Sequence, residues 1–101
     1  MFLIQMLLPK NRRGGAAPDA AVATTRAELV DRFGGVTAYE RAPALGAWRA
    51  PAGHIERDDV VMVEVLADGF DREWWRAYRA TLESRFEQQE ILVRAIAVDV
   101  L

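Results

Sequence analysis

The sequence predicts an α+β domain in which four antiparallel strands are covered on one face by two helices. Three observations predict it: short apolar runs typical of strands, two segments with apolar residues at helical spacing, and turn residues between them. The strand-like runs are residues 2–8, 35–42, 59–67 and 91–100. One helical segment follows the first run and the other follows the third, which gives the order βαββαβ.

Proline and glycine mark the ends of the first strand and the first helix. Pro9 ends the first run because it cannot donate to a strand ladder. Pro18 is tolerated in the first turn of a helix, where the backbone N–H has no partner to lose. Apolar residues then recur at helical spacing, at Val22, Leu29, Val30 and Phe33. Gly34 is suited to the left-handed residue that ends this helix.

The second half of the chain repeats this pattern after a long connection. Residues 42–58 are punctuated by proline and glycine and leave room for a short strand at residues 47–49. Residues 59–67 are rich in β-branched residues and form the clearest strand in the chain. Asp71 is a good N-cap for the second helix. The apolar stripe of that helix consists of Trp75, Tyr78, Leu82 and Phe86.

Two βαβ units joined by a hairpin define the split arrangement of the ferredoxin-like fold. Right-handed crossovers place both helices on one face of the sheet and give the spatial strand order 4-1-3-2. A chain of 101 residues supplies one core of this kind, so we expect a single domain over residues 1–101. The other face of the sheet is then left open.

Alternation along the strands assigns side chains to the open face. In the third strand Val61, Val63 and Val65 are expected to meet the helices, which sends their neighbours to the open side. The expected open-face residues are Leu3, Gln5, Leu7, Thr37, Tyr39, Arg41, Val60, Met62, Glu64, Leu66, Leu92, Arg94, Ile96 and Val98. Large apolar patches usually mark an interface, so the pattern predicts a homodimer or a larger symmetric assembly.

A small polar set lies within this apolar face: Gln5, Tyr39, Glu64 and Arg94. Glu64 and Arg94 belong to the two strands that flank the first, so their side chains are expected to meet across Gln5. Two interpretations stay open: a structural ion pair, or a ligand-binding or catalytic pair. In the second, Glu64 is the acid or base, Arg94 binds an anion, and Tyr39 and Gln5 orient the ligand.

Composition argues against several other classes of protein. The net charge is −2, and the short basic cluster at residues 10–13 is too small for a nucleic-acid footprint. Cysteine is absent and His54 is the single histidine, so we expect no metal site and no cofactor; Asp58 and Asp59 alternate sides of a strand. The apolar start, residues 1–8, is too short to span a membrane. A cytoplasmic protein is expected.

Four segments together resemble a family of small bacterial proteins that has no assigned activity. These segments are residues 34–39, 46–48, 59–65 and 86–91, and the likeness spans most of the chain after residue 28. The resemblance implies a fold of the dimeric α+β barrel type and no particular chemistry. The function hypothesis is a homo-oligomeric module that binds a small ligand or a partner protein through the open face. The alternative is a small cofactor-independent enzyme, monooxygenase-like or isomerase-like, with its pocket between facing sheets.

Overall fold

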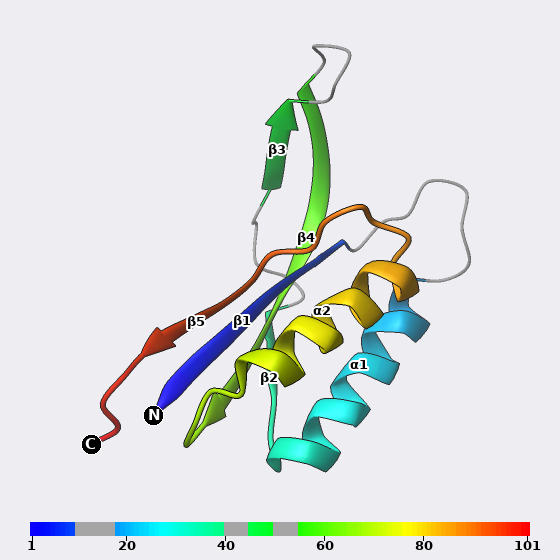
Figure 1. Ribbon diagram of the computed structural model, residues 1–101. Helices are drawn as coiled ribbons and strands as arrows, with labels where there is room; N and C mark the ends of the chain where they lie inside the picture. The colour runs from blue at the N-terminus through cyan, green and yellow to red at the C-terminus, as the bar shows by residue number, and fades with distance from the viewer. Residues whose placement is uncertain (10–17, 40–44, 50–54) are drawn as a thin grey trace.

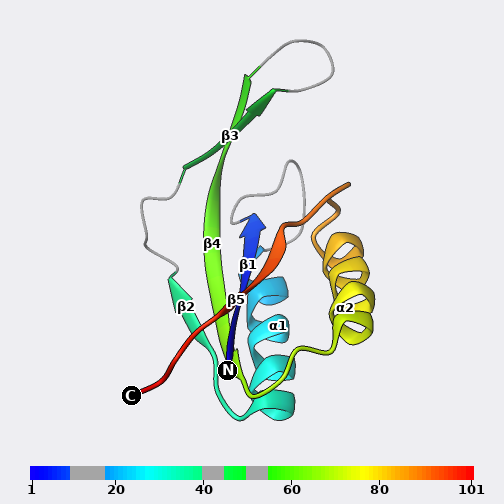
Figure 2. The same ribbon diagram turned by 60° about the vertical axis from the view of Figure 1, so that its left-hand side comes forward.

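The structure is a computed structural model that describes residues 1–9, 18–39, 45–49 and 55–101. Two layers make up the molecule, an antiparallel sheet and a pair of helices lying on one of its faces (Figures 1 and 2). The elements in chain order are β1 (Phe2–Pro9), α1 (Pro18–Phe33), β2 (Thr37–Tyr39), β3 (Leu45–Arg49), β4 (Ile55–Ala67), α2 (Arg72–Arg85) and β5 (Val93–Ala97). The predicted α+β class is therefore confirmed.

β1 lies in the middle of the sheet and sets the register of its neighbours. The strand order is β2-β4-β1-β5, with β3 also paired to β4. β1 pairs with β4 from Phe2 opposite Ala67 to Pro9 opposite Val60. It pairs with β5 from Phe2 opposite Ala97 to Met6 opposite Val93. All these pairings are antiparallel, so residues that face each other across strands lie on the same side of the sheet.

Besides the four expected strands the sheet contains β3 (Leu45–Arg49), which falls where the sequence left room for a short strand at residues 47–49. β3 pairs with the first part of β4, from Leu45 opposite Asp59 to Arg49 opposite Ile55, so β4 begins before the predicted residue 59. This hairpin extends beyond the helix layer (Figure 1). Because no helix covers it, it needs no continuous apolar side, and the sequence Ile-Glu-Arg-Asp over 55–58 carries no such signal.

The core lies between the sheet and the two helices. Val61, Val63 and Val65 are buried against the helices, as the alternation of the strand predicts. In β1 the core residues are Ile4, Met6 and Leu8. In α2 and just beyond it they are Trp75, Tyr78, Leu82 and Phe86, so the predicted apolar stripe is confirmed. Asp71 caps this helix by accepting a hydrogen bond from the backbone N–H of Trp74 at 3.1 Å.

α1 departs from its predicted core face at one position. Val30 is 46% exposed, whereas Thr25 is fully buried in line with Val22 and Leu29. The spacing 22, 25, 29 follows one helical face, and the Thr25 hydroxyl is satisfied there because it donates to the carbonyl of Ala21 at 2.9 Å. Hydrophobicity alone favours Val30 over Thr25 as the buried residue. The helical spacing with Val22 and Leu29 and the hydrogen bond to Ala21 nevertheless place Thr25 inside.

We expect Leu82→Ala to destabilise the fold by about 2–5 kcal/mol, because it opens a cavity at a fully buried position. Val30→Ala is the matched control and should change the free energy of unfolding by less than about 0.5 kcal/mol, since Val30 already contacts water. Urea denaturation of the two variants measures both values. If Val30→Ala lowered the free energy of unfolding as much as Leu82→Ala, Val30 would have to be buried, and the assignment of the core face of α1 would be contradicted.

Candidate functional site

The open face of the sheet carries three rows of side chains that cross β4, β1 and β5. The register places these residues side by side, and the carbonyl of Leu92 accepts a hydrogen bond from the backbone N–H of Leu7 at 3.1 Å. The first row is Leu66, Leu3 and Ile96; the second is Glu64, Gln5 and Arg94; the third is Met62, Leu7 and Leu92. One polar row therefore lies between two apolar rows.

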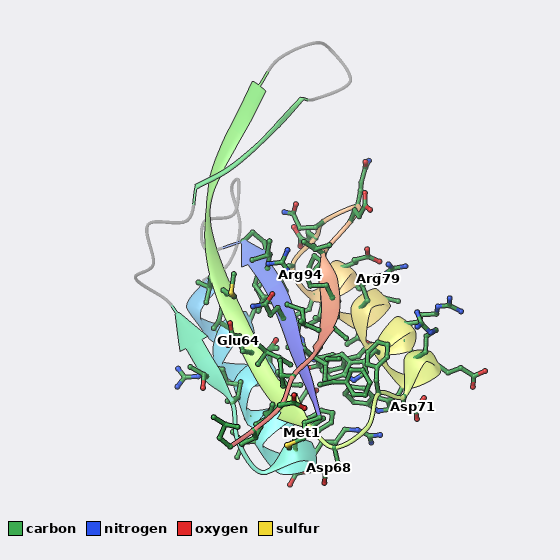
Figure 3. All side chains as sticks on the ribbon, turned by 90° about the vertical axis from the view of Figure 1, so that its left-hand side faces the viewer. Met1, Glu64, Asp68, Asp71, Arg79 and Arg94 are labelled. Carbon is green, nitrogen blue, oxygen red and sulfur yellow. The ribbon has the colours of Figure 1, made fainter. Side chains whose placement is uncertain are left out.

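Gln5 joins the two charged residues of the polar row. Its Nε2 donates to Oε1 of Glu64 at 2.9 Å, and its Oε1 accepts from Nε of Arg94 at 2.6 Å. Figure 3 looks onto this face and shows Glu64 and Arg94 from the strands on either side of β1. The amide thus presents its donor to the carboxylate and its acceptor to the guanidinium, which matches the charge at each end.

Only 8% of Gln5 is exposed, although it lies on the face that no helix covers. Its neighbours in the row and the apolar residues on either side shield it. Both ends of its amide are hydrogen-bonded, so its burial leaves no polar atom without a partner. These partners set the orientation of the amide, because the flipped amide would turn its donor to the guanidinium and its acceptor to the carboxylate.

The structure brings together three of the four predicted site residues. Glu64 and Arg94 meet through Gln5; within the described residues no direct ion pair joins them. Tyr39 pairs with Met62 in the backbone register of β2 and β4, one row away from Glu64. His54 lies outside the described residues, and Asp58 and Asp59 are described as backbone of β4.

The polar row keeps unused hydrogen-bonding capacity. Within the described residues, Oε2 of Glu64 and the two Nη groups of Arg94 have no hydrogen-bond partner. Arg94 is exposed and Glu64 is half-buried. The row is neutral as a whole but has a negative end over β4 and a positive end over β5. It can therefore bind a group, or a second surface, that presents the opposite order of charges.

A second polar cluster joins the two helices, and the sequence analysis missed it. Arg85 of α2 contacts Glu28 of α1 at 2.7 Å and donates to the hydroxyl of Thr25 at 2.9 Å. The Tyr78 hydroxyl donates to Oε1 of Glu28 at 3.0 Å. Thr25 recurs at helical spacing with Val22 and Leu29, which is the one signal in the sequence that marks it as inward-facing.

These contacts shift the ionisation of the cluster. The hydrogen bond from Arg85 lowers the pKa of Glu28, and the same bond raises the pKa of Arg85. Burial, followed by the hydrogen bond to Glu28 and the charge of that carboxylate, raises the pKa of Tyr78 to about 12. The cluster has a structural role, since every group in it is used to hold α1 against α2.

A hollow of about 750 Å³ lies at the C-terminal end of α1. It is lined mainly by aromatic residues of both helices and by the turn after β4, including Phe33, Phe70, Trp74 and Trp75. The guanidinium of Arg32 lies 4.1 Å from the ring centre of Trp74 at its wall. Leu66 of the open face contributes to its lining, but Glu64 and Arg94 do not, so the polar row lies outside this hollow.

The part of the chain that the structure describes contains neither a cluster of metal ligands nor a membrane-spanning helix. No three histidine, aspartate or glutamate side chains there converge as a metal site would require. No helix there is long and apolar enough to cross a membrane.

Comparisons with known proteins show the fold. No family model matches the chain, and no curated protein matches its sequence. A crystal structure of CutA from the phytopathogenic bacterium Xylella fastidiosa is similar, with TM-score 0.62 and 18% identity over 98% of this chain and 84% of that one. A phage SAM lyase in complex with S-methyl-5′-thioadenosine has TM-score 0.61 and 15% identity over 94% and 79%. Identities this low define an architecture and leave function to the site.

Alkaline titration tests the helix cluster. We expect Tyr78 to ionise with a pKa of about 12, above its ordinary value of 10.0, because burial disfavours the phenolate. The neutral phenol therefore adds stability that is complete below pH 10 and is lost as the pH rises through about 12. Tyrosinate absorbance of the wild type minus that of Tyr78→Phe isolates this group. A difference curve with its midpoint near 10 in folded protein would contradict the assignment.

Proposed function

We propose that this chain is a homo-oligomeric module whose subunits meet through the open faces of their sheets. One observation carries the proposal: the side chains of Leu66, Leu92 and Ile96 are 42%, 48% and 43% exposed on a face that no helix covers. Together with the half-buried Leu3 and Leu7 they make up two apolar rows, one on each side of the polar row. Surfaces of this kind on small soluble domains usually belong to an interface.

The homodimer is the simplest assembly that covers this face. A twofold interface uses the same surface on both subunits, so one apolar face is sufficient to build it. The proposal takes the sheet as the complete ferredoxin-like arrangement. The predicted order 4-1-3-2 of its four main strands then corresponds to β5-β1-β4-β2, so β2 lies outside β4 and widens the face. Membership of the bacterial family of unassigned activity, the extent of the domain over residues 1–101 and a cytoplasmic location stay predictions.

We expect light scattering after size exclusion to give at least twice the 11.3 kDa mass of the chain at micromolar concentration. Leu66→Asp should convert the assembly to monomer, because a carboxylate on the apolar row loses its hydration when the faces meet. Val30→Asp is the matched control, since Val30 is a similarly exposed apolar residue on α1. A wild-type mass of 11.3 kDa would refute the proposal.

A second candidate is a ligand site between facing sheets, with binding or enzymatic activity. The observation that favours it is the polar row, because a carboxylate and a guanidinium with free atoms would be enclosed by the facing apolar rows. There Glu64 would act as acid or base, Arg94 would hold an anion, and Gln5 and Tyr39 would orient the ligand. This activity needs no cofactor.

A thermal-shift screen tests the ligand site. A ligand at 100 times its dissociation constant should stabilise the protein by about 2.7 kcal/mol. Carboxylic acids and nucleosides, including S-methyl-5′-thioadenosine, are suitable probes. Glu64→Gln should abolish the shift, whereas Glu73→Gln on the exposed surface of α2 should preserve it. If Glu64→Gln left every detected shift unchanged, the role of this residue would be abandoned.

A further inference from the structure

We propose that the open face binds a second copy of this chain about a twofold axis that runs along β1 above Gln5, so that Glu64 of each copy faces Arg94 of the other. This inference rests on the proposed function and names the partner surface and its orientation. It follows from the order of charges in the polar row, from the chemistry of the two apolar rows and from the atoms that the row leaves free.

A twofold axis that brings two sheet faces together must lie in the plane between them. Two principal directions then exist. An axis along β1 exchanges the two sides of this strand, so β4 of one copy lies over β5 of the other. An axis across the strands, parallel to the rows, keeps β4 over β4 and β5 over β5. Both directions leave the strands of the two copies aligned at the spacing of about 10 Å at which sheets pack, so the polar row has to decide between them.

The polar row distinguishes these directions. The row has its carboxylate over β4 and its guanidinium over β5, joined through Gln5. An axis along β1 places Glu64 opposite Arg94 twice, whereas an axis across the strands places like charges opposite each other. An axis across the strands that is shifted off the polar row sets the charges against an apolar row and leaves them desolvated without partners. Like-charge and unpaired-charge contacts therefore count against an axis across the strands.

The apolar rows fit the same axis. Rotation about β1 keeps each row at its own height along the strand and reverses its order. Leu66 then lies over Ile96 of the second copy, and Met62 lies over Leu92. Both matches are contacts between large aliphatic side chains, so one operation satisfies the polar row and both apolar rows together.

The free atoms of the row supply the contacts between copies. Within the described residues, Oε2 of Glu64 and both Nη groups of Arg94 are unused after the bonds to Gln5 are made. Arginine and carboxylate form paired, charge-assisted hydrogen bonds. Each copy can therefore donate and accept across the interface without breaking its own row, and four charges form one network around two central glutamines.

Charge reversal with mixing tests this arrangement. Glu64→Arg and Arg94→Glu should each raise the Kd of the homodimer by about tenfold or more, because each creates like-charge contacts across the axis. An equimolar mixture of the two variants should form a heterodimer with a Kd near that of the wild type, since every facing pair is then opposite in charge. Sedimentation velocity with one variant fluorescently labelled measures all three values.

The mixture also separates an interface effect from a folding defect, because a chain that misfolds is not repaired by a second faulty chain. Arg79→Glu on the exposed surface of α2 is the control and should leave the Kd unchanged. A monomeric wild type would defeat the proposed function itself. A wild-type dimer that both reversals leave intact, or an assembly larger than a dimer, would overturn the axis and leave the oligomeric proposal standing.

Cross-linking gives a second, independent measurement. The chain has no cysteine, so Glu64→Cys and Arg94→Cys each introduce a unique thiol. With a bismaleimide that spans about 10 Å, the distance between facing sheets, a mixture of the two variants should cross-link more efficiently than either alone. Stronger cross-linking of Glu64→Cys with itself would show that β4 lies over β4 and would overturn the inference.

Discussion

The position of β1 between β4 and β5, buried on its helix side, constrains the rest of the structure. Ile4, Met6 and Leu8 are almost fully buried against the helices. Because side chains alternate along a strand, this burial places Gln5 on the opposite face, and a slip of one residue would put the amide in the apolar core. The register of β4 and β5 then brings Glu64 and Arg94 to the two sides of the same residue.

The two faces of the sheet differ in what their apolar residues contact. On the helix side, burial of apolar surface supplies the stability of the domain, and the polar groups at its border are satisfied by the cluster of Thr25, Glu28, Tyr78 and Arg85. On the open side the apolar side chains of a single chain stay exposed. The polar row between them makes this face asymmetric, because its carboxylate lies over β4 and its guanidinium over β5. An apolar face alone sets no orientation for a partner, whereas a row with a charge at each end does.

The helix pair is held by polar contacts as well as by its apolar stripe. Arg85 and Glu28 are 57 residues apart in the chain, and their contact joins α2 to α1 where the two helices lie side by side on the sheet. Such a cluster leaves almost no trace in the sequence, because single charged residues on amphipathic helices are common on exposed surfaces. Thr25 is the exception, since it lies on the helical face defined by Val22 and Leu29.

The sequence by itself determined the order of the elements other than β3, the inward faces of β4 and α2, and the side of the sheet on which Gln5, Glu64 and Arg94 lie. These follow from the periods of strands and helices, which are local backbone geometry. Only the tertiary structure decided that β3 extends β4 beyond the helices, that Thr25 replaces Val30 in the core, and that Gln5 bridges the charged pair. Gln5 contacts Glu64, which lies 59 positions further along the chain, and Arg94, which lies 89 positions further along. Such contacts depend on register and packing.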